Sequence, residues 1–187
     1  MAWSPQHKQQ SREKILSVAA RLFARQGFEN TGIDEVMTAA GLTRGAFYSH
    51  FGSKSELYTE SLRSAAISRL RPALEDPADL ASAVDLQRLI GGYLRMEHVQ
   101  GDNGGCPLAF LVSDISQRDE QVRTTYTGLL QGLIERMQAV SSVEREQVLQ
   151  QVVLMIGGVA IARAVNDPAL QQALIDACKA GVNNTLA

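Results

Sequence analysis

A glycine between two short helical patterns constrains this chain more than any other feature of its sequence. Helix-capping residue types occupy positions 30–32, and apolar residues then recur at helical spacing as far as Gly41. Glycine tolerates the positive φ at which many helices end, so we expect the first helix to end at Gly41. Thr43 can cap a second helix from Arg44 to about His50, with Leu42 beneath the turn. The apolar residues of the first helix are Ile33, Val36, Met37 and Ala40.

Small residues at this corner allow the two helices to approach each other closely. They are Ala39, Ala40 and Gly41, while Ala46 and Phe47 of the second helix are expected to point inward. The other face of the second helix is polar. In a helix-turn-helix, the N-terminal part of the second helix faces base edges in the DNA major groove. The residues that this arrangement would present are Thr43, Arg44, Gly45, Tyr48 and His50.

Helices on either side complete a three-helix core. Upstream, an apolar stripe predicts a helix from about Gln9 to Gln26, which Gly27 ends. Downstream, Ser53 and Glu56 form a capping-box pattern that opens a longer helix. A lysine in the first turn of that helix, at position 54, could bind a backbone phosphate.

A family resemblance covers roughly residues 10–57. The order of residues there, ILSVAARLFARQGFENTGIDEV and then AAGLTRGAFYSHFGSKSEL, resembles the DNA-binding domain of the TetR family of bacterial transcriptional regulators. Met37 departs from the family pattern, in which Ala is common. The resemblance implies an all-α homodimeric repressor that binds a palindromic double-stranded DNA operator. The DNA contacts it implies, together with the turn motif, are Thr31, Thr43, Arg44, Gly45, Tyr48, His50 and Lys54.

The resemblance also implies two domains. Residues 9–71 would be the helix-turn-helix domain, and residues 72–187 a larger helical domain that binds a small-molecule effector of unknown identity and forms the dimer. Residues 1–71 hold ten Lys or Arg and six Asp or Glu, whereas residues 72–187 hold eight and fourteen. A basic first part favours contact with phosphates. Because such a charge is also ordinary for a soluble domain, the turn motif carries the prediction.

Other kinds of protein fit the sequence less well. Paired carboxylates, a nucleophile beside a base and metal-ligand spacings are not found, so we expect no enzyme, no cofactor and no metal site. No signal peptide and no apolar run of roughly 20 residues is evident, so we expect a cytoplasmic protein without membrane contact. The two cysteines predict free thiols. The remaining alternative is a helical protein-interaction adaptor that keeps the helix-turn-helix fold without binding DNA.

Proline, glycine and capping residues divide the rest of the chain into further helices, and nothing there predicts a strand. The expected elements are a linker bracketed by Pro72 and Pro77, a helix to about Gln100, a buried helix opened by Pro107, a long helix capped by Asp119 or Ser116 and ending near residues 141–142, a helix at 148–165, and a last helix opened by Pro168.

The last two helices are the expected dimer interface. Small residues allow helix backbones to approach, and a helix that is apolar on two faces needs a partner on each. The same residues could instead fill the core of one protomer. They are Gly157, Gly158, Ala160, Ala162 and Ala164.

Two further sites are predicted in the second part. Cys106 precedes Pro107 at a helix start, where unpaired N–H groups would favour the thiolate and lower the pKa, although an inert buried thiol is the favoured alternative. Cys178, mid-helix, is expected to be unreactive. An effector pocket could be lined by aromatic, Met and Arg side chains that could also be ordinary core. These candidates are Tyr93, Met96, His98, Phe110, Tyr126, Met137 and Arg163.

Overall fold

The computed structural model describes residues 5–70, 83–101 and 105–184, and every regular element within these ranges is a helix. The all-α prediction is therefore confirmed. The linker expected between Pro72 and Pro77 lies outside the described residues. In chain order the helices are α1 (Pro5–Asn30), α2 (Ile33–Ala39), α3 (Arg44–Phe47), α4 (Lys54–Leu70), α5 (Ala83–Tyr93), α6 (Met96–Gln100), α7 (Pro107–Phe110), α8 (Val112–Ile115), α9 (Glu120–Val140), α10 (Arg145–Ala164) and α11 (Pro168–Asn184).

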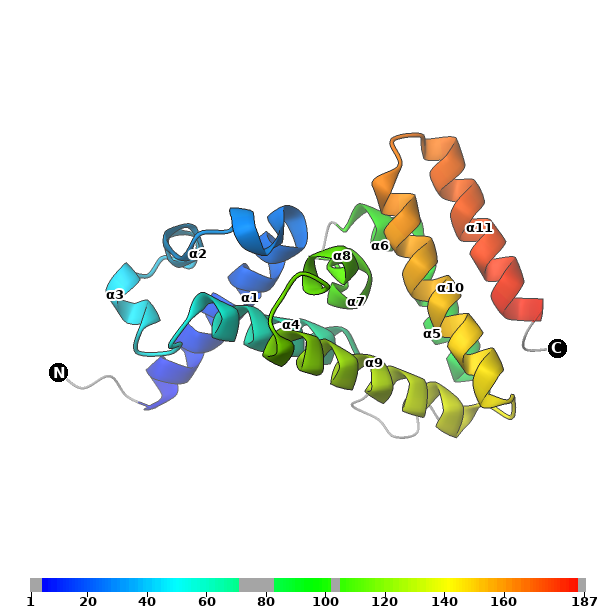
Figure 1. Ribbon diagram of the computed structural model, residues 1–187, viewed down its shortest axis with the longest axis horizontal. Coiled ribbons are helices and arrows are strands. Elements are labelled where there is room, and N and C mark those ends of the chain that lie inside the picture. The colour runs from blue at the N-terminus through cyan, green and yellow to red at the C-terminus, as the bar shows by residue number, and fades with distance from the viewer. Residues whose placement is uncertain (1–4, 71–82, 102–104, 185–187) are drawn as a thin grey trace.

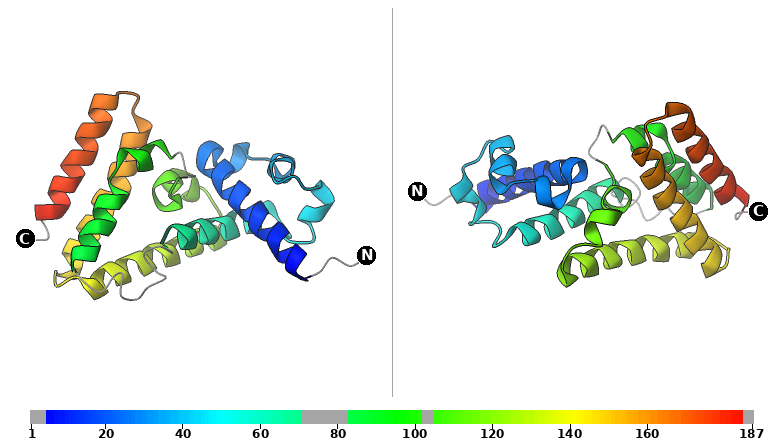
Figure 2. Two further views of the ribbon diagram at one scale, coloured as in Figure 1. Left: turned by 180° about the vertical axis from the view of Figure 1, so that it is seen from behind. Right: turned by 45° about the horizontal axis from the view of Figure 1, so that its top comes forward.

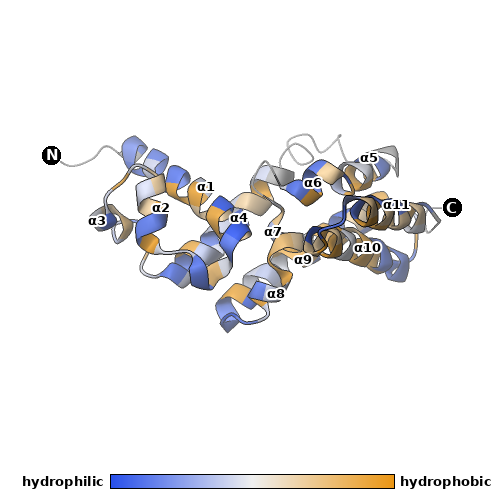
Figure 3. Ribbon diagram, turned by 90° about the horizontal axis from the view of Figure 1, so that it is seen from above, coloured by the Kyte–Doolittle hydropathy of each residue, from blue (hydrophilic) through white to orange (hydrophobic). Residues whose placement is uncertain are grey.

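The molecule is elongated, with α3 near one end and α11 near the other (Figure 1). We call α1–α4 the head, and α5–α11 the body. Seen from above, the short helices α7 and α8 lie on the side of the body that faces the head (Figure 3). In the head α1 packs along α4, and α9 runs from beneath α4 into the body, where α10 and α11 pack side by side (Figures 1 and 2).

Glycines set the ends of the head helices as the sequence predicts. The regular part of α1 stops at Gly27, whose φ is +76°, although helical hydrogen bonding resumes as far as Asn30. Gly41 follows α2 with a φ of +65°. The third helix is shorter than expected, because α3 ends at Phe47 and residues 48–50 form turns. Met37 is 1% exposed and packs in the head core.

Caps and breaks shape the body. Asp119 caps α9 by accepting a hydrogen bond from the Val122 N–H at 3.0 Å, and Pro107 opens α7, both as predicted. The expected continuous helix to Gln100 is wrong, since the chain is extended at Arg95 between α5 and α6. The Arg95 Nε donates a hydrogen bond to the carbonyl of Gly92 at 3.0 Å, so this carbonyl at the C-terminus of α5 has a partner. Gly91 and Gly92 also lower the helix propensity at this point.

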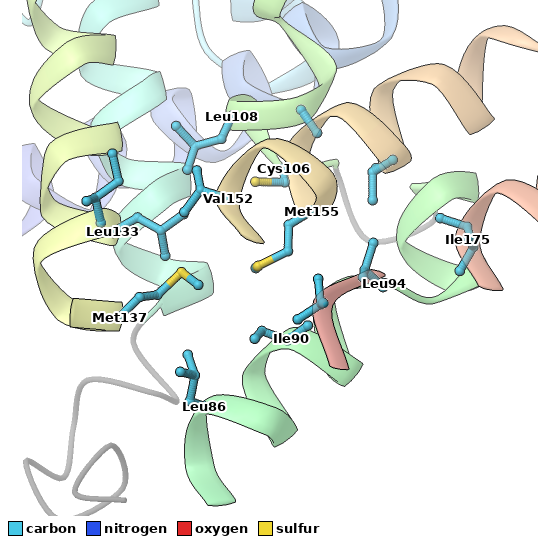
Figure 4. Packing of buried hydrophobic residues seen from close by; sticks show 14 of the residues in the cluster. Leu86, Ile90, Leu94, Cys106, Leu108, Leu133, Met137, Val152, Met155 and Ile175 are labelled. Carbon is cyan, nitrogen blue, oxygen red and sulfur yellow. The ribbon is translucent and has the colours of Figure 1, made fainter. Parts of the chain in front are cut away.

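The two faces of α10 differ. Its inner face is buried and includes Gly158 and Ala162, together with Val152 and Met155, which Figure 4 shows in the body core. A Cβ at Gly158 would lie 2.6 Å from the Cys178 Sγ, so Gly158 lets α10 and α11 pack closely within one protomer. The prediction that Gly158 and Ala162 form the dimer interface is therefore wrong, and they belong to the protomer core.

The outer face of α10 is apolar and exposed. Val153 is 69% exposed, and Ile161 is 55% exposed. With apolar residues on both faces, α10 is by length and composition alone long and apolar enough to cross a membrane, contrary to the expectation from sequence. Its inner face packs in a globular core, which explains the composition without a bilayer.

The head and the body share apolar packing. The cluster of buried residues in the head includes Leu111, which precedes α8, Ile115 of α8, and Val122 at the start of α9. A second cluster fills the body and contains Leu94, Leu133 and Met155 (Figure 4). A boundary at residue 71 therefore separates the helices in sequence but not the cores.

Candidate DNA-binding site and its junction with the body

The end of the head carries an exposed polar surface on a buried apolar support. Phe47 is fully buried, whereas the next residue, Tyr48, is 61% exposed. Thr43, Arg44 and Gly45 are also exposed and precede or open α3. The structure therefore brings together these four residues, all of which were predicted to face DNA. Thr43 takes the extended N-cap conformation, but its hydroxyl makes no capping hydrogen bond within the described residues, contrary to expectation.

Arg44 is held by an acidic neighbour in the free protein. Its Nη1 lies 2.7 Å from the Asp34 Oδ2 of α2, and both side chains are more than 60% exposed. An exposed ion pair of this kind contributes only about 0–1 kcal/mol. A guanine edge, which accepts two hydrogen bonds from arginine, can therefore replace Asp34 as the partner.

His50 is partly buried at the end of the turn that follows α3. Its Nδ1 is buried and has no hydrogen-bond partner among the described residues. Burial lowers the pKa of His50 below its ordinary 6.5, and the nearby charges of Lys8 and Arg12 lower it further. The neutral imidazole is therefore the favoured form at pH 7.

The Lys54 side chain contacts the end of α1. Its ammonium lies 4.4 Å from the centre of the Phe28 ring, and Nζ donates to the Glu29 carbonyl at 3.3 Å. An ammonium has three N–H donors, so this arrangement leaves donors for a phosphate while restricting where the side chain points.

Thr31 does not belong to this surface. It is 0% exposed, and its hydroxyl donates to the Gly27 carbonyl at 2.8 Å. The prediction that Thr31 contacts DNA is therefore wrong for this conformation. The residue instead ties the start of α2 to the end of α1.

Three basic residues near the start of α1 join the surface and were missed from the sequence. Lys8 and Arg12 lie close enough to His50 to affect its pKa. The Lys14 ammonium lies 3.5 Å from the position that a Cβ at Gly41 would take. Their spacing along one helix was visible in the sequence, but their proximity to His50 and Gly41 depends on how α1 crosses the head.

The head is joined to the body by a carboxylate that was not selected from the sequence. Asp114 of α8 accepts a hydrogen bond from the Phe28 N–H at 3.2 Å through Oδ1. Its Oδ2 accepts one from the Tyr58 hydroxyl of α4 at 2.5 Å. Burial and the adjacent carboxylate both raise the pKa of Tyr58 well above its ordinary value, so the hydroxyl remains a donor.

Arg118 reinforces the same place. Its guanidinium lies 4.7 Å from the centre of the Phe28 ring and pairs with Glu29 at 2.5 Å. The pair lowers the pKa of Glu29 and raises that of Arg118. Phe28 is thus held by two cations, Arg118 and Lys54, and packs edge-on against Tyr58 at 5.2 Å. We call Phe28, Tyr58, Asp114 and Arg118 the junction.

A second contact between the body and α1 is made by Arg163 of α10. Its guanidinium lies 3.8 Å from the centre of the Phe110 ring and donates to the carbonyls of Val99 at 3.3 Å and Ala24 at 3.4 Å. Burial lowers its pKa. The guanidinium therefore meets the C-terminal parts of α6 and α1, where helix carbonyls favour a positive charge.

The predicted effector pocket is only partly assembled. Tyr93 contacts His98 at 4.3 Å between ring centres, His98 stacks near Phe110 at 6.0 Å, and Phe110 lies under Arg163. These four residues form one cluster, which we call the aromatic cluster. The other candidates lie in core positions, where Tyr126 donates to the Leu108 carbonyl, Met96 packs against the body core, and Met137 is buried beside Leu133 (Figure 4).

A surface pocket of about 400 Å³ opens elsewhere, between α5 and α11. It is lined by Gln87, Ile90, Gly91, Lys179 and Asn183, none of which was predicted from the sequence.

The two thiols lie in different surroundings. Cys106 is 7% exposed, and the Tyr93 hydroxyl donates to its Sγ at 3.5 Å, which joins it to the aromatic cluster. The helix that follows it, α7, has only four residues, so little helix dipole acts on the thiol. Burial raises the pKa of Cys178, in line with its expected low reactivity.

Comparisons with known proteins agree with this architecture. Residues 15–60 match the family described as bacterial regulatory proteins, tetR family. The HTH-type transcriptional regulator AcrR of Shigella flexneri is 51% identical over 55 residues, covering 29% of this chain and 26% of AcrR. The HTH-type transcriptional regulator LmrA of Bacillus subtilis is 32% identical over 120 residues, covering 60% of this chain and 61% of LmrA. The matches thus span less than two thirds of these curated relatives.

Solved structures share the whole fold. The reduced form of NemR from E. coli is 21% identical, with a TM-score of 0.77 over 95% of this chain and 98% of that one. A TetR transcriptional regulator from Chloroflexus aurantiacus is 20% identical, with a TM-score of 0.76 over 97% and 100%. These matches lead to one conclusion: residues 15–60 carry the helix-turn-helix of the TetR family of bacterial regulatory proteins, and the whole chain shares the fold of solved TetR-family regulators.

Proposed function

We propose that the protein is a cytoplasmic homodimeric repressor that binds a palindromic DNA operator and is released by an effector. The observation that carries this proposal is the contrast at α3, where Phe47 is fully buried and the adjacent Tyr48 is 61% exposed beside exposed Thr43, Arg44 and Gly45. A rigid support beneath a protruding polar edge suits insertion into a major groove.

Each residue of this surface has a distinct proposed role. Arg44 reads a guanine after exchanging Asp34 for the base edge. Tyr48 contacts a phosphate or a thymine methyl group. Lys54 and Lys14 bind backbone phosphates, which positions α3 without reading sequence. His50, neutral at pH 7, contributes a polar contact without charge.

The proposed dimer interface is the outer face of α10 and the neighbouring face of α11. Leu149, Val153 and Ile161 are exposed on α10, as is Leu170 on α11, and α10 packs directly against α11. Gly157 has open space where a Cβ would lie, which allows a partner helix to approach. Exposed apolar side chains that form one continuous surface favour a protein partner. A second copy also supplies the second α3 that a palindrome requires.

The effector is proposed to act at the aromatic cluster. Arg163 there contacts both the body, at Val99, and the head, at Ala24. A small molecule that displaces Phe110 or Arg163, or a thiol-reactive compound that modifies the neighbouring Cys106, would therefore disturb a contact with the head. The two kinds of effector differ in whether they need the thiol.

Selection of bound duplexes from random DNA tests the proposed function. We expect a palindromic site, bound by a dimer, with affinity that falls steeply as salt rises. The variant Tyr48→Ala should bind it weakly while keeping the wild-type helical content. Failure to enrich any duplex would contradict the proposal and favour the protein-interaction adaptor instead.

A further inference from the structure

We propose that Asp114 is a positioning residue for DNA binding. Its carboxylate fixes the angle at which the body holds the head, and thereby the separation of the two reading helices in the dimer. This inference rests on the proposed binding of an operator by a dimer, and it adds the element that sets the geometry of that binding.

The carboxylate reaches both long helices of the head. Its Oδ1 accepts from the Phe28 N–H near the end of α1, and its Oδ2 accepts from the Tyr58 hydroxyl of α4. A single contact restrains a distance, whereas two contacts on different helices restrain an orientation. The α2–α3 unit is carried between these two helices, so its direction follows theirs (Figure 1).

The backbone at the junction is built for this contact. Gly27 takes a φ of +76°, and a Cβ there would lie 3.3 Å from the Asp114 Oδ1. A side chain at this position would therefore both strain the backbone and crowd the carboxylate. The same residue accepts the hydrogen bond from Thr31, so the turn that Asp114 holds also holds the start of α2. Movement of Asp114 is thereby transmitted to the α2–α3 unit over only a few residues.

Directional bonds matter here because the rest of the contact is apolar. Leu111, Ile115 and Val122 pack into the head core, and such packing resists separation more than it resists a small change of angle. Hydrogen bonds weaken steeply when their angles are lost. The Phe28 ring, held between Arg118 and Lys54, limits rotation of the same segment further.

The dependence of Kd on half-site spacing is a suitable measurement, because a loss of protein stability alone does not change it. One inserted base pair moves one half-site by about 3.4 Å and rotates it by about 35° relative to the other. We would measure Kd for the selected operator and for versions with one base pair inserted or removed at its centre. The ratio of altered to original Kd reports how rigidly the two heads are held.

Two tyrosines provide matched variants. Tyr58→Phe removes the phenol hydroxyl that donates to Asp114 at the junction. Tyr126→Phe removes a hydroxyl that does not bond to a junction residue and instead donates to the Leu108 carbonyl at 2.8 Å. Both should lower thermal stability, Tyr58→Phe by more, because its hydroxyl donates to a charged carboxylate. Only Tyr58→Phe should weaken the original operator, by about three- to tenfold, and reduce the spacing ratio at least about threefold. Asp114→Ala should act in the same direction and more strongly.

The outcomes distinguish failure of the positioning role of Asp114 from failure of the proposed DNA binding. A folded Tyr58→Phe protein with the wild-type spacing ratio would overturn the positioning role of Asp114, even if Asp114→Ala fails to fold. An equal reduction of the ratio by Tyr126→Phe would also overturn it. A wild-type protein that binds no duplex would refute the proposed function, and wild-type binding that ignores spacing would refute the fixed angle alone.

Discussion

Replacement of Ile161 by glutamate should separate the proposed dimer. Full burial of an isoleucine side chain contributes about 1.5–3 kcal/mol. Ile161 is 55% exposed in the protomer, so covering it contributes about 1 kcal/mol per copy. A two-fold interface contains the change twice, so about 2 kcal/mol of apolar burial is lost. Burying two unpaired carboxylates costs several kcal/mol more. The dimer Kd should therefore rise at least about 1,000-fold.

Sedimentation velocity at micromolar concentration measures this change, with circular dichroism as the test of folding. Ile67→Glu is the matched control, because Ile67 lies on α4 of the head and is also 55% exposed. We expect Ile161→Glu to give folded monomers that bind the operator weakly and Ile67→Glu to remain dimeric. An Ile161→Glu protein that stays dimeric would refute the assignment of this face. Gly158→Arg should instead unfold the protomer, since Gly158 packs against Cys178.

Three further results are expected. Arg44→Ala should weaken the best site by about 1–3 kcal/mol and relax the preference at one base pair per half-site, whereas Lys54→Ala should weaken all duplexes alike, and both effects can be read from binding to a set of single-base operator variants. If the effector is thiol-reactive, a quinone or hypochlorite should release operator from wild type and from Cys178→Ser but not from Cys106→Ser; equal release from all three would assign the effector to a reversible ligand. The lowered pKa of His50 means that the unfolded chain binds more protons below about pH 6.5, so the free energy of unfolding should fall as pH drops below that value. His50→Gln should flatten this fall in denaturant titrations, and an unchanged pH profile would contradict the assignment.

The local structure of the head follows from the sequence because its signals act over a few residues. Gly41 takes the positive φ expected of it, and Phe47 lies inside while Tyr48 lies outside. The capping box at α4 is formed in a modified way, with Ser53 accepting from the Glu56 N–H and Glu56 accepting from Gly52. Each of these features depends on neighbours within one helical turn.

The junction could not be predicted in the same way. Asp114 and Phe28 are 86 positions apart, and neither residue type is unusual at its place. Their contact depends on how α8 meets the end of α1, which is decided by tertiary packing. The burial of Thr31 and the two faces of α10 depend on packing in the same way. Small residues at Gly158 and Ala162 indicate a close approach of helices, but not whether the partner belongs to the same protomer.

The shared packing of the head and the body has a consequence for cooperativity. Leu111, Ile115 and Val122 complete the core of the head, although they follow the proposed boundary at residue 71 by 40 or more positions. A fragment that stops at the boundary would lose these side chains from the core that also contains Phe23 and Tyr58. Domains that melt separately need cores of their own. We therefore expect the full chain to show one calorimetric transition with equal calorimetric and van't Hoff enthalpies, and the isolated head to be unfolded or only marginally folded.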